Sequence, residues 1–271
     1  MPNWCYQQMS VIGSKKDLVK FAKDCWLVEQ DEVMSVDENG KEVKITKVSE
    51  GWSLNHLDPI PEDLLDTVAG SVRDEEKTDH EAKKKSNLEK YGYQDWYHYA
   101  NAVWGSKWGA SEVEFQSDSP EKGKVEPEPF GSTNQIRIYI ESAWSPAIGL
   151  YQRISKKYPN LLFAVYYTEE ANMFAGWEVI VNGEVLFTNS VSTDEPDDLI
   201  ALYKKANEDE NSETMDDYYE AHSEWQLSIV DECETQLGKF LPDCISYIRS
   251  NAKRKEKVTF REWEDEQLDK S

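Results

Sequence analysis

A strand, a sharp junction and a helix follow one another in residues 135–160, and this stretch constrains the fold most. Apolar and polar residues alternate over residues 136–141, the period of a strand with one buried face. Ser145 and Pro146 are typical of a helix start, and apolar residues then recur at helical spacing. The apolar run 161–167 predicts another strand. This strand–helix–strand unit indicates a fold class but no chemistry.

The rest of the first 190 residues predicts more strands and a second sheet-packing helix. Ser14 is placed to cap a helix over residues 15–25, whose apolar residues share one face. We expect a helical insertion around residues 52–110, with its clearest helical pattern over residues 91–104. Alternation and hairpin turns predict further strands: residues 4–12, 41–48, 111–116 and 176–186, the last around Asn182-Gly183.

Without the insertion, these elements follow the order β-α-β-β-α-β, which is the ferredoxin-like pattern. We therefore expect a ferredoxin-like α+β domain over residues 1–190, with a mainly antiparallel sheet and two helices on one face. Residues 191–271 are acidic and helical in pattern, so we place a domain boundary near residue 190. This acidic helical extension carries an apolar stripe from Tyr218 to Cys233 that ends near Gly238, and such a stripe needs a surface to cover.

Two shorter helices are predicted after that stripe. Residues 242–250 begin with a proline and carry apolar residues at helical spacing. Thr259 and Glu262 then resemble a capping box, which predicts the start of a last, charged helix.

The formal net charge of −23 argues against two classes of partner. Nucleic acids and anionic membranes carry the same sign, so we expect no direct nucleic-acid binding and no membrane association. A solvated acidic surface, a partner with a basic surface and mimicry of a polyanion stay open as interpretations. The sequence shows no signal peptide and no apolar run of the ~20 residues that a spanning helix needs, so we expect a cytoplasmic protein with reduced thiols.

Motifs for catalysis, metal binding or cofactor binding are missing from the sequence. The four cysteines are widely spaced and form no C-x-x-C pair. His56 with Asp58, and Asp95 with His98, lack a third ligand at a recognisable spacing, so ordinary hydrogen bonds are expected. Ser145 lacks a G-x-S-x-G elbow, and nucleotide-binding glycine loops are absent. We expect no metal and no cofactor, and we favour a non-enzymatic protein.

Two groups of residues are candidate binding sites. Tryptophans at turns and strand ends, with polar and basic neighbours, suit recognition of a ligand or partner; these residues are Trp104, Lys107, Trp108, Arg137, Trp144, Ser145 and Trp177. The alternative for this group is an aromatic core that holds the long loops. An acidic run is the candidate surface for a basic partner and comprises Asp194, Glu195, Asp197, Asp198, Asp216 and Asp217. Its alternative is the solvated face of helices.

Five fragments together resemble one family: PNWC at residues 2–5, NHLDPIPEDL at 55–64, WGSKW at 104–108, AWSP at 143–146 and FAGW at 174–177. As a set they resemble the YubB-type ferredoxin-like proteins of phages and conjugative plasmids. The resemblance covers residues 2–187 and implies a ferredoxin-like fold and a phage or plasmid origin. It implies no reaction, and the acidic extension lies outside it.

Three functional hypotheses follow. The first is a phage or plasmid accessory protein with a counter-defence role, which binds a host or defence protein in the cytoplasm of an infected or plasmid-bearing cell. The second is a protein that binds or sequesters a nucleotide-like small molecule near the tryptophans, with Lys107 and Arg137 as anion partners. The third is a virion-associated structural component. The sequence leaves homo-oligomerisation open.

Overall fold

Alternating burial along the strands builds the main sheet, since Ile136, Ile138 and Ile140 are all buried on one face. The computed structural model describes residues 2–36, 42–116, 123–209, 212–254, 256 and 258–269. The strands of its main sheet are β1 (Trp4–Gly13), β4 (Glu112–Gln116), β5 (Glu128–Phe130), β6 (Thr133–Ala143), β7 (Leu162–Glu169), β8 (Ala175–Val181) and β9 (Glu184–Val191). They lie in the order β4-β6-β1-β7-β8-β9, all neighbours are antiparallel, and β5 pairs with the start of β6. The mixed α/β class with an antiparallel sheet is confirmed.

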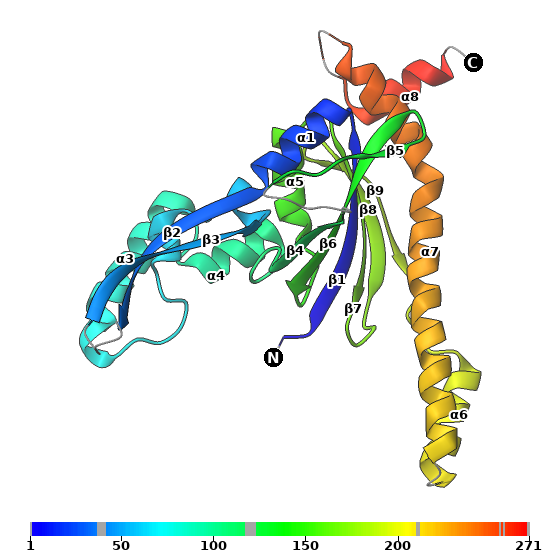
Figure 1. Ribbon diagram of the computed structural model, residues 1–271, viewed down its shortest axis with the longest axis horizontal. Coiled ribbons are helices and arrows are strands. Elements are labelled where there is room, and N and C mark those ends of the chain that lie inside the picture. Colours follow the sequence, from blue (N-terminus) through cyan, green and yellow to red (C-terminus); the bar gives the residue numbers. More distant parts are fainter. Residues whose placement is uncertain are drawn as a thin grey trace.

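Helices α1 (Lys15–Asp24) and α5 (Ile148–Lys157) pack on one face of this sheet (Figure 1). The predicted cap of α1 is confirmed, because the backbone N–H of Asp17 donates to the Ser14 hydroxyl at 3.1 Å. The predicted hairpin turn between β8 and β9 is also confirmed. Asn182 and Gly183 have φ angles of 50° and 85°, as a type I′ turn requires.

The predicted start of α5 at Ser145 and Pro146 is wrong. The helix begins at Ile148, and its N-cap residue, Ala147, makes no side-chain cap. The Ser145 hydroxyl instead donates to the carbonyl oxygen of Gly105 at 2.6 Å, so it joins the insertion to the strand–helix junction.

Helices α7 (Ser212–Ala252) and α8 (Phe260–Leu268) cover the other face over β7, β8 and β9. Figure 1 shows α7 along that side of the sheet, opposite α1 and α5. The predicted break near Gly238 and the new helix at Pro242 are wrong, because α7 is continuous through both residues. Buried side chains lie on both sides of Pro242, among them Leu237 and Cys244. Their packing on the sheet offsets the hydrogen bond that the proline cannot make.

The predicted capping box at α8 is confirmed. Glu262 Oε2 accepts from the backbone N–H of Thr259 at 2.8 Å, and the Thr259 hydroxyl accepts from the backbone N–H of Glu262 at 3.3 Å. Two of the four donors at this helix start are therefore satisfied locally.

The segment between α1 and β4 contains a two-stranded hairpin and several short helices. Its elements are β2 (Trp26–Val36), β3 (Glu42–Trp52), α2 (Glu62–Leu65), α3 (Lys77–Tyr91), α4 (Trp96–Tyr99), 3-10 turns at Asn55–Leu57 and Asp74–Glu76, and a π-helical turn at Ala100–Trp104. The sequence predicted β3 as residues 41–48, of which residue 41 lies outside the described residues, and missed β2. The predicted helix over 91–104 is interrupted, because Gly92 ends α3 at a φ of 78° and Asp95 caps α4.

Helix α6 (Asp197–Asp209) pairs with the first part of α7 as a helical hairpin. In Figure 1 this pair extends beyond the lower end of the sheet. Within the part of the chain that the structure describes, no helix is long and apolar enough to cross a membrane.

Candidate functional site

Trp104 is a core residue at the end of the π-helical turn Ala100–Trp104. Only 5% of it is exposed, and its indole N–H donates to the carbonyl oxygen of Asp58 at 3.1 Å. The Asp58 carboxylate is buried and accepts from the guanidinium of Arg153, with Lys157 Nζ at 3.3 Å. The ordinary hydrogen bonding expected for Asp58 is therefore present, and this ion pair holds the loop against α5.

A chain of polar contacts fixes the junction between β6 and α5. The Tyr151 hydroxyl donates to Gln7 Oε1 at 2.8 Å, and Gln7 Nε2 donates to the Ser142 hydroxyl at 2.7 Å. Ser142 in turn donates to the carbonyl oxygen of Ser145 at 2.6 Å. Since Ser145 donates onward to Gly105, its hydroxyl serves the backbone of the junction.

Exposed aromatic rings collect at the same end of the sheet. Trp108 is 37% exposed and its ring lies 6.3 Å from that of Trp4, while Lys107 Nζ lies 4.4 Å above the Trp108 ring. Trp144 is 52% exposed with a φ of 70°, and its backbone N–H donates to the carbonyl oxygen of Asn3 at 2.9 Å. A positive φ is unusual for a large side chain and costs conformational energy, and such strain is concentrated at functional sites.

The other two residues of the first candidate group lie elsewhere. Trp177 is 2% exposed and packs under α7, on the face opposite Trp104. Arg137 lies on β6 and pairs with Glu128 of β5 at 3.0 Å. The structure therefore brings Trp104, Lys107, Trp108, Trp144 and Ser145 to one end of the sheet and separates Trp177 and Arg137 from them. Sequence reasoning omitted Trp4, although it belongs to the PNWC fragment.

All six residues of the acidic candidate surface are exposed on the α6–α7 hairpin or the loop before it: Asp194, Glu195, Asp197, Asp198, Asp216 and Asp217. A run of ring contacts leads along the interface of the two helices, from Tyr203 to Tyr218 at 4.9 Å, to His222 at 5.5 Å and to Trp225 at 5.3 Å. His222 Nε2 also lies 3.6 Å from Glu195 Oε1. Asp197 and Asp198 occupy the first turn of α6, where carboxylates also stabilise the helix dipole.

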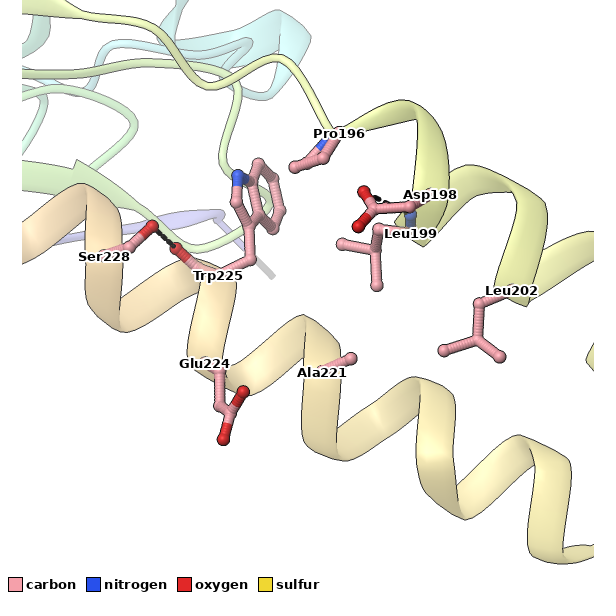
Figure 2. A pocket seen from close by; sticks show the side chains of 8 residues that line it. All are labelled: Pro196, Asp198, Leu199, Leu202, Ala221, Glu224, Trp225 and Ser228. Carbon is pink, nitrogen blue, oxygen red and sulfur yellow. Dashed lines mark hydrogen bonds between the residues drawn. The ribbon is translucent and has the colours of Figure 1, made fainter.

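A pocket of about 600 Å³ opens between the two helices of the hairpin. Figure 2 shows Pro196, Leu199 and Leu202 of the α6 side facing Trp225 and Ala221 of α7. In the same view the Asp198 carboxylate points toward the Trp225 ring. Glu224 and Ser228 complete the lining. The arrangement offers apolar walls with carboxylates at the rim, which suits an apolar side chain from a basic partner.

The described residues contain no cluster of three or more histidine, cysteine, aspartate or glutamate side chains able to hold a metal ion. All four cysteines are buried thiols. His56 Nε2 lies 2.6 Å from the carbonyl oxygen of Asp24, and His98 Nδ1 lies 2.8 Å from Asp95 Oδ1. Both histidines thus make the ordinary hydrogen bonds that the sequence predicted.

Comparison with known proteins identifies one family model. Residues 123–220 match a model described as "Ferredoxin-like domain in Api92-like protein", which supports a ferredoxin-like domain in this chain. The match crosses residue 190, where we predicted a domain boundary, and that boundary stays a prediction.

Among solved structures, the chain is similar to a crystal structure of protein api92 from Yersinia pseudotuberculosis. The two share 9% sequence identity and align with a TM-score of 0.35, over 72% of this chain and 100% of the api92 chain. No curated protein matches the sequence.

Proposed function

We propose that this chain is a non-enzymatic accessory protein of a phage or plasmid that binds a host or defence protein with a basic surface. The α6–α7 hairpin is the binding element, and the observation that carries the proposal is its pocket between exposed carboxylates. The hairpin extends beyond the sheet, where a large partner meets no steric obstacle from the sheet (Figure 1). Protein interfaces combine such an apolar anchor with a polar rim.

The net charge supports a basic protein partner over nucleic acid or an anionic membrane, since those carry the same sign as this chain. Mimicry of a polyanion is consistent with the same charge and requires no further element. The resemblance to YubB-type proteins supports the phage or plasmid origin, and the cytoplasm of the host cell is the proposed place of action.

We further assign the ferredoxin-like β-α-β-β-α-β core to β1, α1, β4, β6, α5 and β7. The observed strand order β4-β6-β1-β7 supports this assignment, because each helix then joins two parallel strands that have one antiparallel strand between them, as in that pattern. In this assignment the residues between α1 and β4 are an insertion. After β7, the strands β8 and β9 are added to the edge of the sheet, and α7 is added to its second face.

The test is affinity capture of the tagged chain from host lysate at low and high salt. The four-fold substitution Asp197→Lys, Asp198→Lys, Asp216→Lys and Asp217→Lys reverses charge on the hairpin. We expect it to abolish capture of a partner that the wild-type chain holds at low salt and loses at high salt. A partner held equally by both chains in low and high salt would contradict the proposal.

A charge-matched variant separates the hairpin from net charge. Four exposed acids at the start of α3 and the turn before it, Glu75, Glu76, Asp79 and Glu81, are replaced by lysine in the control. Both variants change the net charge equally, so only a specific hairpin site distinguishes them. Leu202→Asp is a third variant, which places a charge in the apolar wall of the pocket and is expected to weaken capture.

One observation favours a second candidate function, the binding of a nucleotide-like small molecule. Trp108 is exposed beneath Lys107, and Trp144 is exposed with a strained backbone. Quenching of tryptophan fluorescence together with a thermal shift in a panel of nucleotides would support this function. If the Trp144→Ala variant then shows no quenching and no thermal shift, the ligand site lies at the end of the sheet that carries Trp144.

A further inference from the structure

Among the described residues, no helix packs on the second sheet face over β4 and β6. Helices α7 and α8 pack on β7, β8 and β9, and their core includes no side chain from β4 or β6. The strand register places two rows of outward side chains on β4, β6 and β1. The first row is Glu112, Glu141 and Tyr6, and the second is Glu114, Tyr139 and Gln8. We call these six residues the open sheet face.

The open sheet face combines aromatic rings with carboxylates. Glu112 and Glu114 are exposed, and Tyr6, Tyr139 and Glu141 are partly buried. The Tyr139 hydroxyl donates to Glu141 Oε1 at 3.2 Å. Burial raises the pKa of both tyrosines further above its ordinary value, with added repulsion from Glu170 on Tyr6 and from Glu141 on both, and the rings are neutral at physiological pH.

Further acids surround this face, and the neighbouring Arg137 is already paired. Glu170 repels the ionised form of Tyr6 from the β7–β8 turn, and Asp231 and Glu234 of α7 act likewise on Tyr166 beside Gln8. Arg137, the next residue outward on β6, pairs with Glu128. The potential at the open sheet face is therefore negative, and a cationic partner complements it.

Charge and ring chemistry together select the partner. A nucleic acid is repelled, although stacking on an open sheet is a common mode of RNA binding. A second copy of this chain is also repelled, since each carries a net charge of −23. Arginine fits both features, because its guanidinium stacks on aromatic rings and pairs with carboxylates in the same plane. Lys107 over Trp108 is a cation–ring contact of this kind within the chain itself.

We propose that the open sheet face binds an arginine-rich segment of another protein. The guanidinium groups stack on Tyr6 and Tyr139 and pair with Glu114 and Glu141. This surface is separate from the α6–α7 hairpin, so the proposal does not depend on the function assigned to the hairpin.

The test measures binding of fluorescently labelled octa-arginine and octa-lysine peptides to the full chain at physiological salt. We expect octa-arginine to bind several-fold more tightly than octa-lysine, because a planar guanidinium stacks flat on a ring and pairs bidentately with a carboxylate, whereas an ammonium group is a point charge. Glu114→Gln with Glu141→Gln is expected to weaken octa-arginine binding by about 10-fold. Tyr139→Ala is expected to weaken it by roughly 3-fold to 10-fold, and Tyr139→Phe to retain it.

Controls decide between this face and unspecific attraction. Glu75→Gln with Glu76→Gln removes the same charge from an exposed turn before α3 and should leave the affinity within about 2-fold of the wild type. Equal weakening by both double variants would overturn the proposal. A loss of peptide binding caused only by charge reversal on the hairpin would also overturn it, and would assign the cation site to the hairpin. The hairpin charge-reversal variant is expected to lose its lysate partner but to bind the peptide as the wild type does. That combination would show two separate surfaces, as proposed.

Discussion

Trp177 of β8 donates its indole N–H to Gln236 Oε1 of α7 at 3.0 Å. Asn189 of β9 donates to the same oxygen at 2.8 Å, so one glutamine joins two strands to the helix. The Trp177 ring also lies 5.1 Å from that of Phe240. With 2% of its surface exposed, Trp177 holds α7 on the sheet and offers no surface to a ligand.

Replacing Trp177 should therefore affect stability. We expect Trp177→Ala to lower the free energy of unfolding by about 3–5 kcal/mol, because it removes a buried ring and leaves Gln236 without one donor. Urea unfolding followed by circular dichroism measures this change. Trp144→Ala is the matched control, since the exposed Trp144 should change stability by less than about 1 kcal/mol. Similar losses in both variants would show that burial does not distinguish the two tryptophans.

One substitution should have opposite effects at two helical glycines. A Cβ at Gly149 of α5 would lie 2.2 Å from the carbonyl oxygen of Val103, so Gly149→Ala forces the π-helical turn away from α5. A Cβ at Gly238 of α7 meets no atom within 4 Å. We expect Gly238→Ala to raise the free energy of unfolding by about 0.5–1 kcal/mol, and Gly149→Ala to lower it by more than that. Thermal unfolding of both variants measures the signs, and destabilisation by Gly238→Ala would contradict the open surroundings of that glycine.

The sequence predicted elements well where local pattern and tertiary packing agree. Alternation at Ile136, Ile138 and Ile140 predicted their strand, and Ser14, Thr259 and Glu262 predicted helix starts, because each signal acts within a few residues. Local rules failed where distant packing decides. Gly238 and Pro242 are helix breakers, yet the sheet beneath α7 keeps both within one helix.

The candidate sites show the same difference. The sequence identified exposed carboxylates such as Asp198 and Asp216, since charge alone predicts exposure. It did not predict the pocket beside Trp225 or the rows that place Tyr6 beside Glu141, because both depend on pairing between segments far apart in the chain. Trp108 and Trp177 look alike in sequence, and only the fold separates the exposed ring from the buried one.

The four cysteines should be unreactive in the folded chain. All are buried, and burial raises the pKa of the Cys5 and Cys244 thiols to about 12 and that of Cys233 to about 11. Thiols with such pKa values contain almost no thiolate at neutral pH. We expect a chromogenic disulfide reagent to react with none of them before unfolding and with all of them in denaturant. Lys239→Cys on the exposed side of α7 should add one fast thiol, and fast reaction of the wild-type chain would contradict the buried core.

Glu178 should make stability depend on pH. Burial raises the pKa of this carboxyl group from 4.5 to about 7, and a hydrogen bond with Thr188 lowers it in part. The folded chain therefore holds a proton that the unfolded chain has released between pH 4.5 and about 7. The contribution of Glu178 to stability is fully present below this window and is lost as the pH rises through it. We expect Glu178→Gln to be more stable than the wild type above pH 7, by about 1–2 kcal/mol once solvent screening is allowed for.

The difference between Glu178→Gln and the wild type isolates this group, because the self-repulsion of the other carboxylates is common to both chains. Urea unfolding at a series of pH values should show the difference growing from pH 4.5 to about 7 and then staying constant. Thr188→Val is an independent check, since removing the hydrogen bond that favours the carboxylate should raise the pKa further and move the upper end of the window to higher pH. A difference that is the same at every pH would mean that Glu178 titrates normally in the folded chain.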